Sequence, residues 1–393
     1  MNVQFVKAEE RDRDEVIDLA NYVFSHNGTP IDFPVLLPKL YKKKFFMDSI
    51  HYLAKEDERV KAVVGAYPLE MQITRAGPKS DQVITVSGRG IGMVSVHPYC
   101  RSKGYMKALM KMALDDMKKD GVVFSCLGGQ RQRYEYFGFH PAGSSYSFGV
   151  NKHNISHTLG RDFKSSLALA KINADEKTAL DSIMTFHETK KIRMKRGRDR
   201  LFDLLSSWKN EVYIVKNKTD IEGYLVYNCN DYISEIVLTD YSRLCEVLFL
   251  VQNGRDNHIR VNSSPLETEK MNSLSRFTGN FSGSFSYQFS VFDYAKLSDA
   301  LIQSKANLPN GRFVFQLNGE NGVPDKKIRL FSGPDGSGAE ETDDTAETSL
   351  SNKEAVAFLF SPVEAEINPV IKENVFLRAL LPLPLHIEDA DRI

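Results

Sequence analysis

Residues 93–106 read MVSVHPYCRSKGYM, and this stretch decides the fold that the sequence predicts. The apolar run at 93–96 indicates a buried strand, which a turn then joins to a helix. Apolar side chains recur at helical spacing from Met106 to Met117, so the helix would bury one face. A second apolar run at 122–127 predicts another buried strand after this helix.

The turn before the helix has the chemistry of a phosphate-binding loop. A helix that starts here leaves several backbone N–H groups unpaired, and its dipole adds partial positive charge at the same end. Gly104 allows the main chain to approach a ligand closely, while Arg101 and Lys103 add full positive charges. For these residues alone, an ordinary strand-to-helix turn is the alternative. The sequence lacks the glycine patterns of P-loop NTPases and dinucleotide-binding folds, so neither class is supported.

The pattern Val-x-Pro-x-x-Arg-x-x-Gly at 96–104 resembles the pyrophosphate loop of the GNAT acyl-CoA N-acetyltransferases. That loop usually reads Arg/Gln-x-x-Gly-x-Gly/Ala. Arg101 and Gly104 match it, and Met106 replaces the last small residue. The resemblance implies that two parallel strands, 92–96 and 122–127, splay apart and hold the pantetheine arm of CoA. It also implies contacts with CoA from Val94, Ser95, Val96, Arg101, Ser102, Lys103, Gly104, Tyr105, Met106 and Gln130.

Length and composition narrow the class of protein further. A chain of 393 residues predicts two or three domains. Lys plus Arg equals Asp plus Glu, at 51 each, so no excess of positive charge points to nucleic acid. The four cysteines have no metal-binding spacing, and no apolar run is long enough to span a membrane. We therefore expect a cytoplasmic protein with reduced thiols and no metal, membrane or nucleic-acid partner.

The second half of the chain repeats part of this pattern. From 211 to 261 the predicted strands and helix echo the order of the first part, without the Arg-x-x-Gly loop. This indicates a degenerate, non-binding copy. Before it, residues 171–203 read as helical and contain a basic run at 190–200. We interpret that run as a solvated helix face, and contact with a substrate tail or nucleic acid is the alternative.

A GNAT-like domain, a degenerate copy and an α/β tail domain together resemble the Eis (enhanced intracellular survival) family of N-acetyltransferases. The resemblance implies an α/β (α+β) fold with domains at 1–155, 156–284 and 285–393. The last domain would be similar to sterol carrier protein 2. The resemblance further implies acetyl-CoA as co-substrate and assembly as a homohexamer.

The same resemblance implies the catalytic groups. In the Eis family a tyrosine in the motif Tyr-x-x-Phe-Gly protonates the departing CoA thiolate. The match here is Tyr134, with Tyr136 as the runner-up. The family's base is the main-chain carboxylate of the last residue, here Ile393, although family tails commonly end in an aromatic residue. A packed aromatic residue and a frayed terminus are the structural alternatives. We interpret Cys126 as a buried, inert cysteine rather than an acyl carrier.

The sequence therefore predicts an acetyl-CoA-dependent N-acetyltransferase that transfers acetyl directly to a primary amine. Glu388, Asp389 and Asp391 would make the site acidic. This favours a polycationic acceptor, such as an aminoglycoside or a polyamine, or else a lysine side chain. The alternatives are a protein that binds lipid or another apolar ligand without catalysis, and a CoA-binding regulator.

Overall fold

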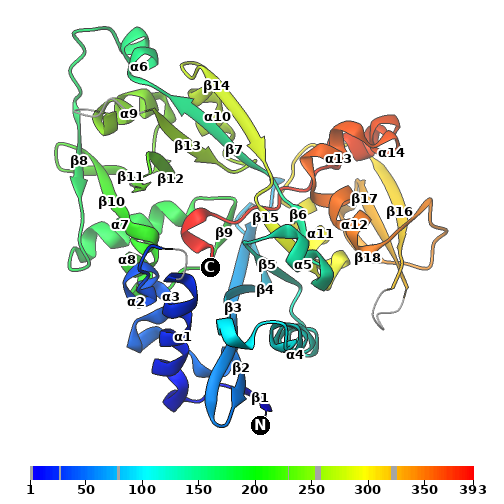
Figure 1. The fold of residues 1–393 in the computed structure, drawn as a ribbon. Coiled ribbons are helices and arrows are strands. Elements are labelled where there is room, and N and C mark those ends of the chain that lie inside the picture. The colour runs from blue at the N-terminus through cyan, green and yellow to red at the C-terminus, as the bar shows by residue number, and fades with distance from the viewer. Residues whose placement is uncertain (1–2, 26–27, 78–79, 229, 253–257, 320–324) are drawn as a thin grey trace.

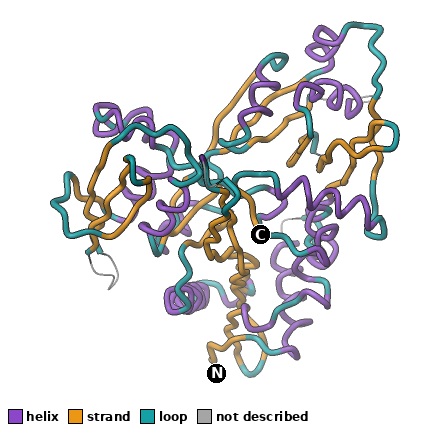
Figure 2. The backbone as a smooth tube through the Cα atoms, turned by 180° about the vertical axis from the view of Figure 1, so that it is seen from behind, coloured by secondary structure: helices purple, strands orange, loops and turns teal. Residues whose placement is uncertain are grey.

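The strands of this protein form three sheets in the residues that its computed structural model describes, which are 3–25, 28–77, 80–228, 230–252, 258–319 and 325–393. Helices pack on each sheet, which confirms the predicted α/β class (Figure 1). The opposite view shows the same three groups of strands, with the C-terminus at their centre (Figure 2).

The first sheet is built mainly from the N-terminal part of the chain. In spatial order its strands are β1 (Val3–Lys7), β2 (His51–Glu56), β3 (Arg59–Thr74), β4 (Val83–Val96), β5 (Phe124–Leu127), β15 (Tyr287–Val291) and β6 (His140–Ala142), and β9 (Ile192–Met194) also pairs with β3. Its helices are α1 (Arg13–Ser25), α2 (Phe33–Leu36), α3 (Pro38–Tyr41), α4 (Tyr105–Lys119) and α5 (Arg131–Tyr134). Helices α1 to α3 share a core with one face, and α4 shares a core with the other.

Strands β4 and β5 run parallel, and they pair only from Gly88 to Gly90 on β4. Beyond Gly90, β4 continues to Val96, whereas β5 ends at Leu127. The predicted separation of two parallel strands is therefore confirmed. It opens the sheet at the point where the predicted phosphate loop begins.

A β-bulge lies in β4 at this opening. On β3, Val63 pairs with Ser95 while Gly65 pairs with Gly92, so β4 carries an extra residue between them. Met93 adopts φ 53°, a left-handed conformation that is uncommon for a residue with a side chain. Gly88 and Gly90 of the same strand lie outside this bulge. Those glycines pair in register, and Gly88 is needed because a Cβ there would lie 2.5 Å from Cζ of Phe124.

Strand β15 joins the first sheet from far along the chain. It lies between β5 and β6 and runs antiparallel to both. Phe289, at its centre, is fully buried, and its ring centroid lies 6.3 Å from that of Phe124 on β5. Residues 287–291, which the sequence assigns to the third domain, thus complete the sheet of the first.

The second sheet repeats one feature of the first. In spatial order its strands are β14 (Asn280–Ser284), β7 (Ser145–Val150), β13 (Ile259–Ser263), β12 (Tyr232–Leu238), β11 (Asp220–Asn228), β10 (Asn210–Asn217) and β8 (Leu167–Lys171). Its helices are α6 (Lys152–Leu159), α7 (Lys177–Glu188), α8 (Leu201–Leu205), α9 (Leu244–Gln252) and α10 (Thr268–Ser275). Like β4 and β5, the parallel strands β12 and β13 are joined by a helix and pair over a short stretch. The turn before that helix carries Asp240 as its cap in place of a basic loop.

The third sheet packs onto the first. Its strands, in order, are β18 (Gly336–Glu341), β17 (Lys326–Gly333), β16 (Gly311–Leu317) and β19 (Thr348–Leu350). Its helices are α11 (Tyr294–Ile302), α12 (Asn352–Phe360), α13 (Pro362–Ile367), α14 (Pro369–Glu373) and α15 (Val375–Leu380). Phe315 and Leu359 of this unit share one apolar core with Met71 and Phe124 of the first sheet. The residues after α15 then run back as an extended tail toward the first and second sheets (Figure 1).

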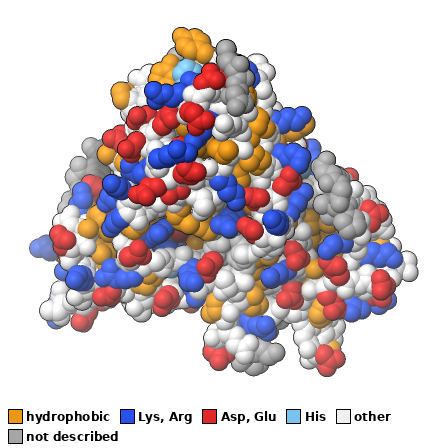
Figure 3. All heavy atoms as spheres, turned by 90° about the horizontal axis from the view of Figure 1, so that it is seen from below, with side chains coloured by type: hydrophobic (Ala, Val, Ile, Leu, Met, Phe, Trp, Pro, Cys, Tyr) orange, Lys and Arg blue, Asp and Glu red, His pale blue; other side chains and the backbone are white. Residues whose placement is uncertain are grey.

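Acidic and basic side chains are interspersed over the face in Figure 3, without a large region of one sign. This matches their equal numbers in the sequence. No helix in the described ranges has the length and apolar character that crossing a membrane requires.

The insertion of β15 predicts a large effect of Phe289→Ala on stability. Because Phe289 is fully buried, the truncation should lower the free energy of unfolding by about 3–5 kcal/mol. Phe285→Ala, at a side chain that is 41% exposed, is the matched control and should change it by less than about 0.5 kcal/mol. Urea denaturation measures both. Equal, small effects would contradict a shared core for β15 and the first sheet.

Candidate active site

A pocket of about 1260 Å³ opens where β4 and β5 separate. Its walls come from the start of α4, the loop before α5, helices α1 and α2, and the C-terminal tail. Most of the predicted CoA-binding residues line it, namely Val94, Val96, Arg101, Ser102, Gly104, Tyr105, Met106 and Gln130. Both predicted catalytic residues, Tyr134 and Ile393, line it as well.

Two predicted CoA contacts point elsewhere. Ser95 is buried in the sheet and does not line the pocket, because side chains alternate along a strand between Val94 and Val96. Lys103 donates to Glu56, with 2.6 Å between Nζ and Oε1, and this bond raises the pKa of Lys103. Tyr105 donates to the same carboxylate. Glu56 therefore fixes the side chains of the loop, and Arg101 is the charged side chain of 101–106 that lines the pocket.

The start of α4 offers main-chain donors to the pocket. Gly104, the residue before the helix, adopts φ 81°, and an added Cβ there would meet nothing within 4 Å. The glycine is thus needed for its left-handed conformation, and it leaves the first N–H groups of α4 open to a ligand. A helix start with this exposure favours a phosphate group.

Tyr134 and Tyr136 differ sharply in surroundings. Tyr134 is 7% exposed, and its burial raises the pKa of the phenol above the ordinary value. Its ring packs over Gly129, where an added Cβ would lie 2.8 Å from Cε2. Tyr136 is 65% exposed, and Nζ of Lys107 lies 4.5 Å from the centre of its ring. Of the two phenols, only Tyr134 combines burial with a place in the pocket wall.

The C-terminal residue lies inside the pocket, against β4. An added Cβ at Gly90 would lie 2.2 Å from Cδ1 of Ile393, and one at Gly92 would lie 2.3 Å from Cγ2. These glycines create the space that the terminal side chain fills. The Tyr287 hydroxyl of β15 donates to the main-chain carboxylate of Ile393 over 3.1 Å. No local pattern pointed to Tyr287, because its partner is 106 residues away along the chain.

A buried lysine fastens the tail just before its end. Nζ of Lys39, on α3, donates to the carbonyl oxygen of Ala390 at 2.6 Å and to that of Arg392. Lys39 is 3% exposed, and burial lowers its pKa to about 8. The sequence missed this residue, because a lysine in a short basic segment ordinarily faces water.

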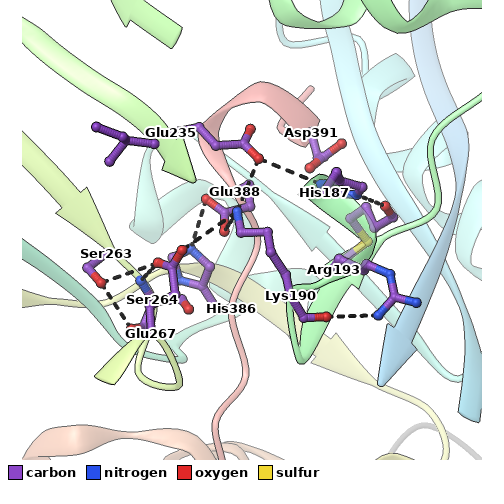
Figure 4. A network of polar contacts seen from close by, with 12 residues as sticks. His187, Lys190, Arg193, Glu235, Ser263, Ser264, Glu267, His386, Glu388 and Asp391 are labelled. Atoms are coloured by element: carbon purple, nitrogen blue, oxygen red, sulfur yellow. Dashed lines mark hydrogen bonds and ion pairs between the residues drawn. The ribbon is translucent and has the colours of Figure 1, made fainter. Parts of the chain in front are cut away.

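A buried network of charges joins the tail to the second sheet (Figure 4). Lys190 lies 2.6 Å from Glu388 of the tail and 3.1 Å from Glu235 of β12. Arg196 lies 2.8 Å from Asp391 of the tail and 2.9 Å from the same Glu235. Despite burial, these cations hold the pKa of Glu388 and of Glu235 well below the ordinary value. We refer to these five residues as the tail clamp.

The tail clamp overturns the interpretation of 171–203 as one helix with a solvated basic face. The helix α7 ends at Glu188, and 192–194 form β9, which pairs with β3. Lys190 and Arg196 are 7% and 6% exposed. Lys190 and Arg196 are buried because they pair with carboxylates of β12 and of the tail. The periodicity of residues 171–203 carries no information about these carboxylates, since they lie elsewhere in the chain.

The sequence suggested that the acidic residues of the tail make the pocket acidic. The structure shows that they do not. Glu388 and Asp391 belong to the tail clamp. Asp389 lines the pocket but is paired, at 2.5 Å to Arg392 and 2.9 Å to Asn262. Besides these paired side chains, the tail brings the main-chain oxygen of Ile393 to the pocket, where Tyr287 donates to it.

Cys126 takes no part in this pocket. It is 2% exposed on β5, and burial raises the pKa of its thiol well above the ordinary value. The protonated thiol is a poor nucleophile, which agrees with its interpretation as inert.

Comparison with known proteins identifies the first part of the chain. Residues 4–142 match the family model described as acetyltransferase (GNAT) domain. GCN5-related N-acetyltransferases from Kribbella flavida and Anabaena variabilis are each 15% identical to the chain, with TM-scores of 0.69 and 0.68. The similarity covers 100% of this chain and 98% and 100% of theirs. Eis1 from Mycobacterium abscessus is 13% identical, with a TM-score of 0.58 over 91% of this chain and 89% of its own. No curated protein sequence matches significantly.

The chain thus carries a GNAT acetyltransferase domain, and it is an acetyltransferase. The solved structures share its fold from end to end, including the second and third sheets. Use of an acyl-CoA follows from the domain.

The tail clamp predicts that Arg196→Met is strongly destabilising. The substitution leaves Glu235 and Asp391 buried without this cation, which should lower the free energy of unfolding by about 3–5 kcal/mol. Lys195→Met removes an exposed partner of Glu70 and should cost less than about 1 kcal/mol. Denaturant unfolding at neutral pH compares the two. A mild effect of Arg196→Met would show that the buried pairs contribute little to holding the tail.

Proposed function

We propose that this protein is an acetyl-CoA-dependent N-acetyltransferase that transfers acetyl directly to a primary amine. One observation carries the proposal: a single pocket contains the phosphate loop at the start of α4, the buried phenol of Tyr134 and the carboxylate of Ile393. These are a binding site for the CoA phosphates, an acid and a base. Both substrates can therefore react together without a covalent enzyme intermediate.

The acyl-CoA binds on the α4 side of the opening. Its pyrophosphate meets the N–H groups after Gly104 and the charge of Arg101, and its pantetheine arm lies along β4 beside Val94 and Val96. The bulge at Met93 interrupts the β3–β4 pairing and supplies main-chain N–H groups for the oxyanion.

The transfer step uses Tyr134 and the carboxylate of Ile393, which lie at the thioester end of the pantetheine arm. The ammonium group of the acceptor first releases one proton to water. The neutral nitrogen then forms a bond to the acetyl carbonyl carbon, and the C–S bond breaks. The nitrogen, positively charged after attack, gives its proton to the carboxylate of Ile393. The phenol of Tyr134 gives its proton to the departing CoA thiolate. An α-carboxylate is an ordinarily weak base, with a pKa of roughly 3.5. It suffices here because the nitrogen becomes strongly acidic as the C–S bond breaks and the product becomes an N-protonated amide.

The fold that the chain shares with Eis1 agrees with the proposal. The resemblance of the third domain to sterol carrier protein 2, the hexamer and the cytoplasmic location stay predictions from the sequence. The polycationic acceptor also stays a prediction from the sequence. Its main support was an acidic site, and this support is lost because Glu388, Asp389 and Asp391 are paired with basic side chains.

Tyr134→Phe should lower kcat by about 100-fold, because the thiolate then leaves without a proton donor. Acetyl-CoA binding should stay unchanged, since the ring and its packing over Gly129 remain. Tyr136→Phe removes an exposed hydroxyl and should alter kcat by less than about twofold. Thiol release from acetyl-CoA measures kcat, and calorimetry measures binding. The reverse order of effects would assign the acid to Tyr136.

Converting the terminal carboxylate of Ile393 to a carboxamide tests the base. The amide keeps the side chain against Gly90 and Gly92 but removes the charge. We expect kcat to fall about 100-fold with acetyl-CoA binding intact. Peptide ligation can supply the carboxamide form. The control is the same chain, prepared by the same ligation but with its natural carboxylate.

Full activity of the carboxamide form would contradict the terminal carboxylate as base. If the native chain binds acetyl-CoA but acetylates no amine, the CoA-binding regulator becomes the better description.

A further inference from the structure

The pocket passes through the opened sheet and therefore has two sides. Tyr134 and Met106 belong to the apolar core between the sheet and α4, where the CoA loop begins. Ile393 and Met93 belong to the core between the sheet and helices α1 to α3. Because the terminal carboxylate must reach the amine, the acceptor binds on the side of α1 to α3.

The acceptor side is lined by apolar and aromatic groups, which we call the apolar wall: Phe24, Ile31, Phe33, Leu36, Trp208 and Tyr232. The rings of Phe24 and Phe33 meet edge to face with centroids 5.1 Å apart. Phe24 is 38% exposed and Trp208 37% exposed, so both present a large ring surface to the pocket. An acceptor that fills this space exchanges water for aromatic contacts.

The charges around the pocket do not suit a polycation. In the described ranges, Asp389 is the acidic side chain among the lining residues, and Arg392 already neutralises it. The other charged lining side chains, Arg101, Lys107 and Arg133, are basic. A polyamine or aminoglycoside would leave all but one of its ammonium groups without a counter-charge on desolvation. The terminal carboxylate can match one.

We propose that the acceptor is a primary amine with a single positive charge and an aromatic or similarly apolar body, of the arylalkylamine class. This rests on the proposed function. The amine lies at the carboxylate of Ile393, and its body packs against the apolar wall. The same wall could instead receive the chain of a longer acyl-CoA. The place of Ile393 beside it favours the amine.

The first experiment compares acceptors with the full chain and acetyl-CoA. We expect kcat/KM for 2-phenylethylamine to exceed that for spermidine and for kanamycin by at least about tenfold, given the area that one ring buries. A higher kcat/KM for spermidine or kanamycin overturns the inference. A higher kcat/KM with octanoyl-CoA than with acetyl-CoA, for every amine, also overturns it by assigning the wall to the acyl chain.

A pair of variants tests the wall itself. Phe24→Glu places a carboxylate in the wall and should raise KM for 2-phenylethylamine about tenfold and lower KM for spermidine. Val35→Glu is the matched control. Val35 lies on α2, is 69% exposed and does not line the pocket, so both KM values should stay within about twofold. Equal effects of the two variants would overturn the assignment.

Binding can be measured without chemistry, because the chain has one tryptophan and it lies in the apolar wall. Titration with 2-phenylethylamine in the presence of CoA should change the Trp208 fluorescence saturably, and spermidine should not. If no amine is acetylated while this change persists, the proposed function fails and the apolar amine site stands. If acetylation occurs without any fluorescence change, the amine site is elsewhere and the inference fails.

Discussion

The placement of the C-terminal tail depends on the buried ion pairs of the tail clamp. Lys190 and Arg196 come from the connection after α7, and each bridges the tail to Glu235 of the second sheet. Buried charges are stable only when they are paired, so the tail has one position in which all four ion pairs form. In that position the tail ends at the opening of the first sheet. The ion pairs with Glu235 of the second sheet therefore set the position of the Ile393 main-chain carboxylate in the pocket of the first sheet.

The first sheet is shaped to receive this tail. Gly90 and Gly92 leave room on β4 for the side chain of Ile393, and the same strand carries the bulge at Met93. Strand β15 then brings Tyr287 to the terminal carboxylate and fills the gap between β5 and β6. The pocket is therefore made by three parts of the chain, whereas the loop at the start of α4 comes from the first part alone.

The fold around residues 93–127 could be predicted because its signals are local. A buried strand, a loop with Arg101 and Gly104, an amphipathic helix and a second strand each leave a periodic or compositional pattern within a few residues. Tyr134 could be chosen over Tyr136 only by resemblance, and burial now separates them. Lys103 looked like a phosphate ligand, and Glu56, 47 residues away, holds it instead.

The sequence by itself determined the α/β class, the parallel strands and the loop with Gly104 that begins α4, since these follow from side-chain periodicity and from the residues that start a helix. Only the tertiary structure decided that the basic segment at 190–200 is buried, that Lys39 and Tyr287 hold the tail, and that the acidic end of the chain is neutralised. The physical reason is that the energy of a charge depends on its partners and on water. For Lys39, Lys190 and Tyr287, the partners in the tail lie more than 100 residues away along the chain.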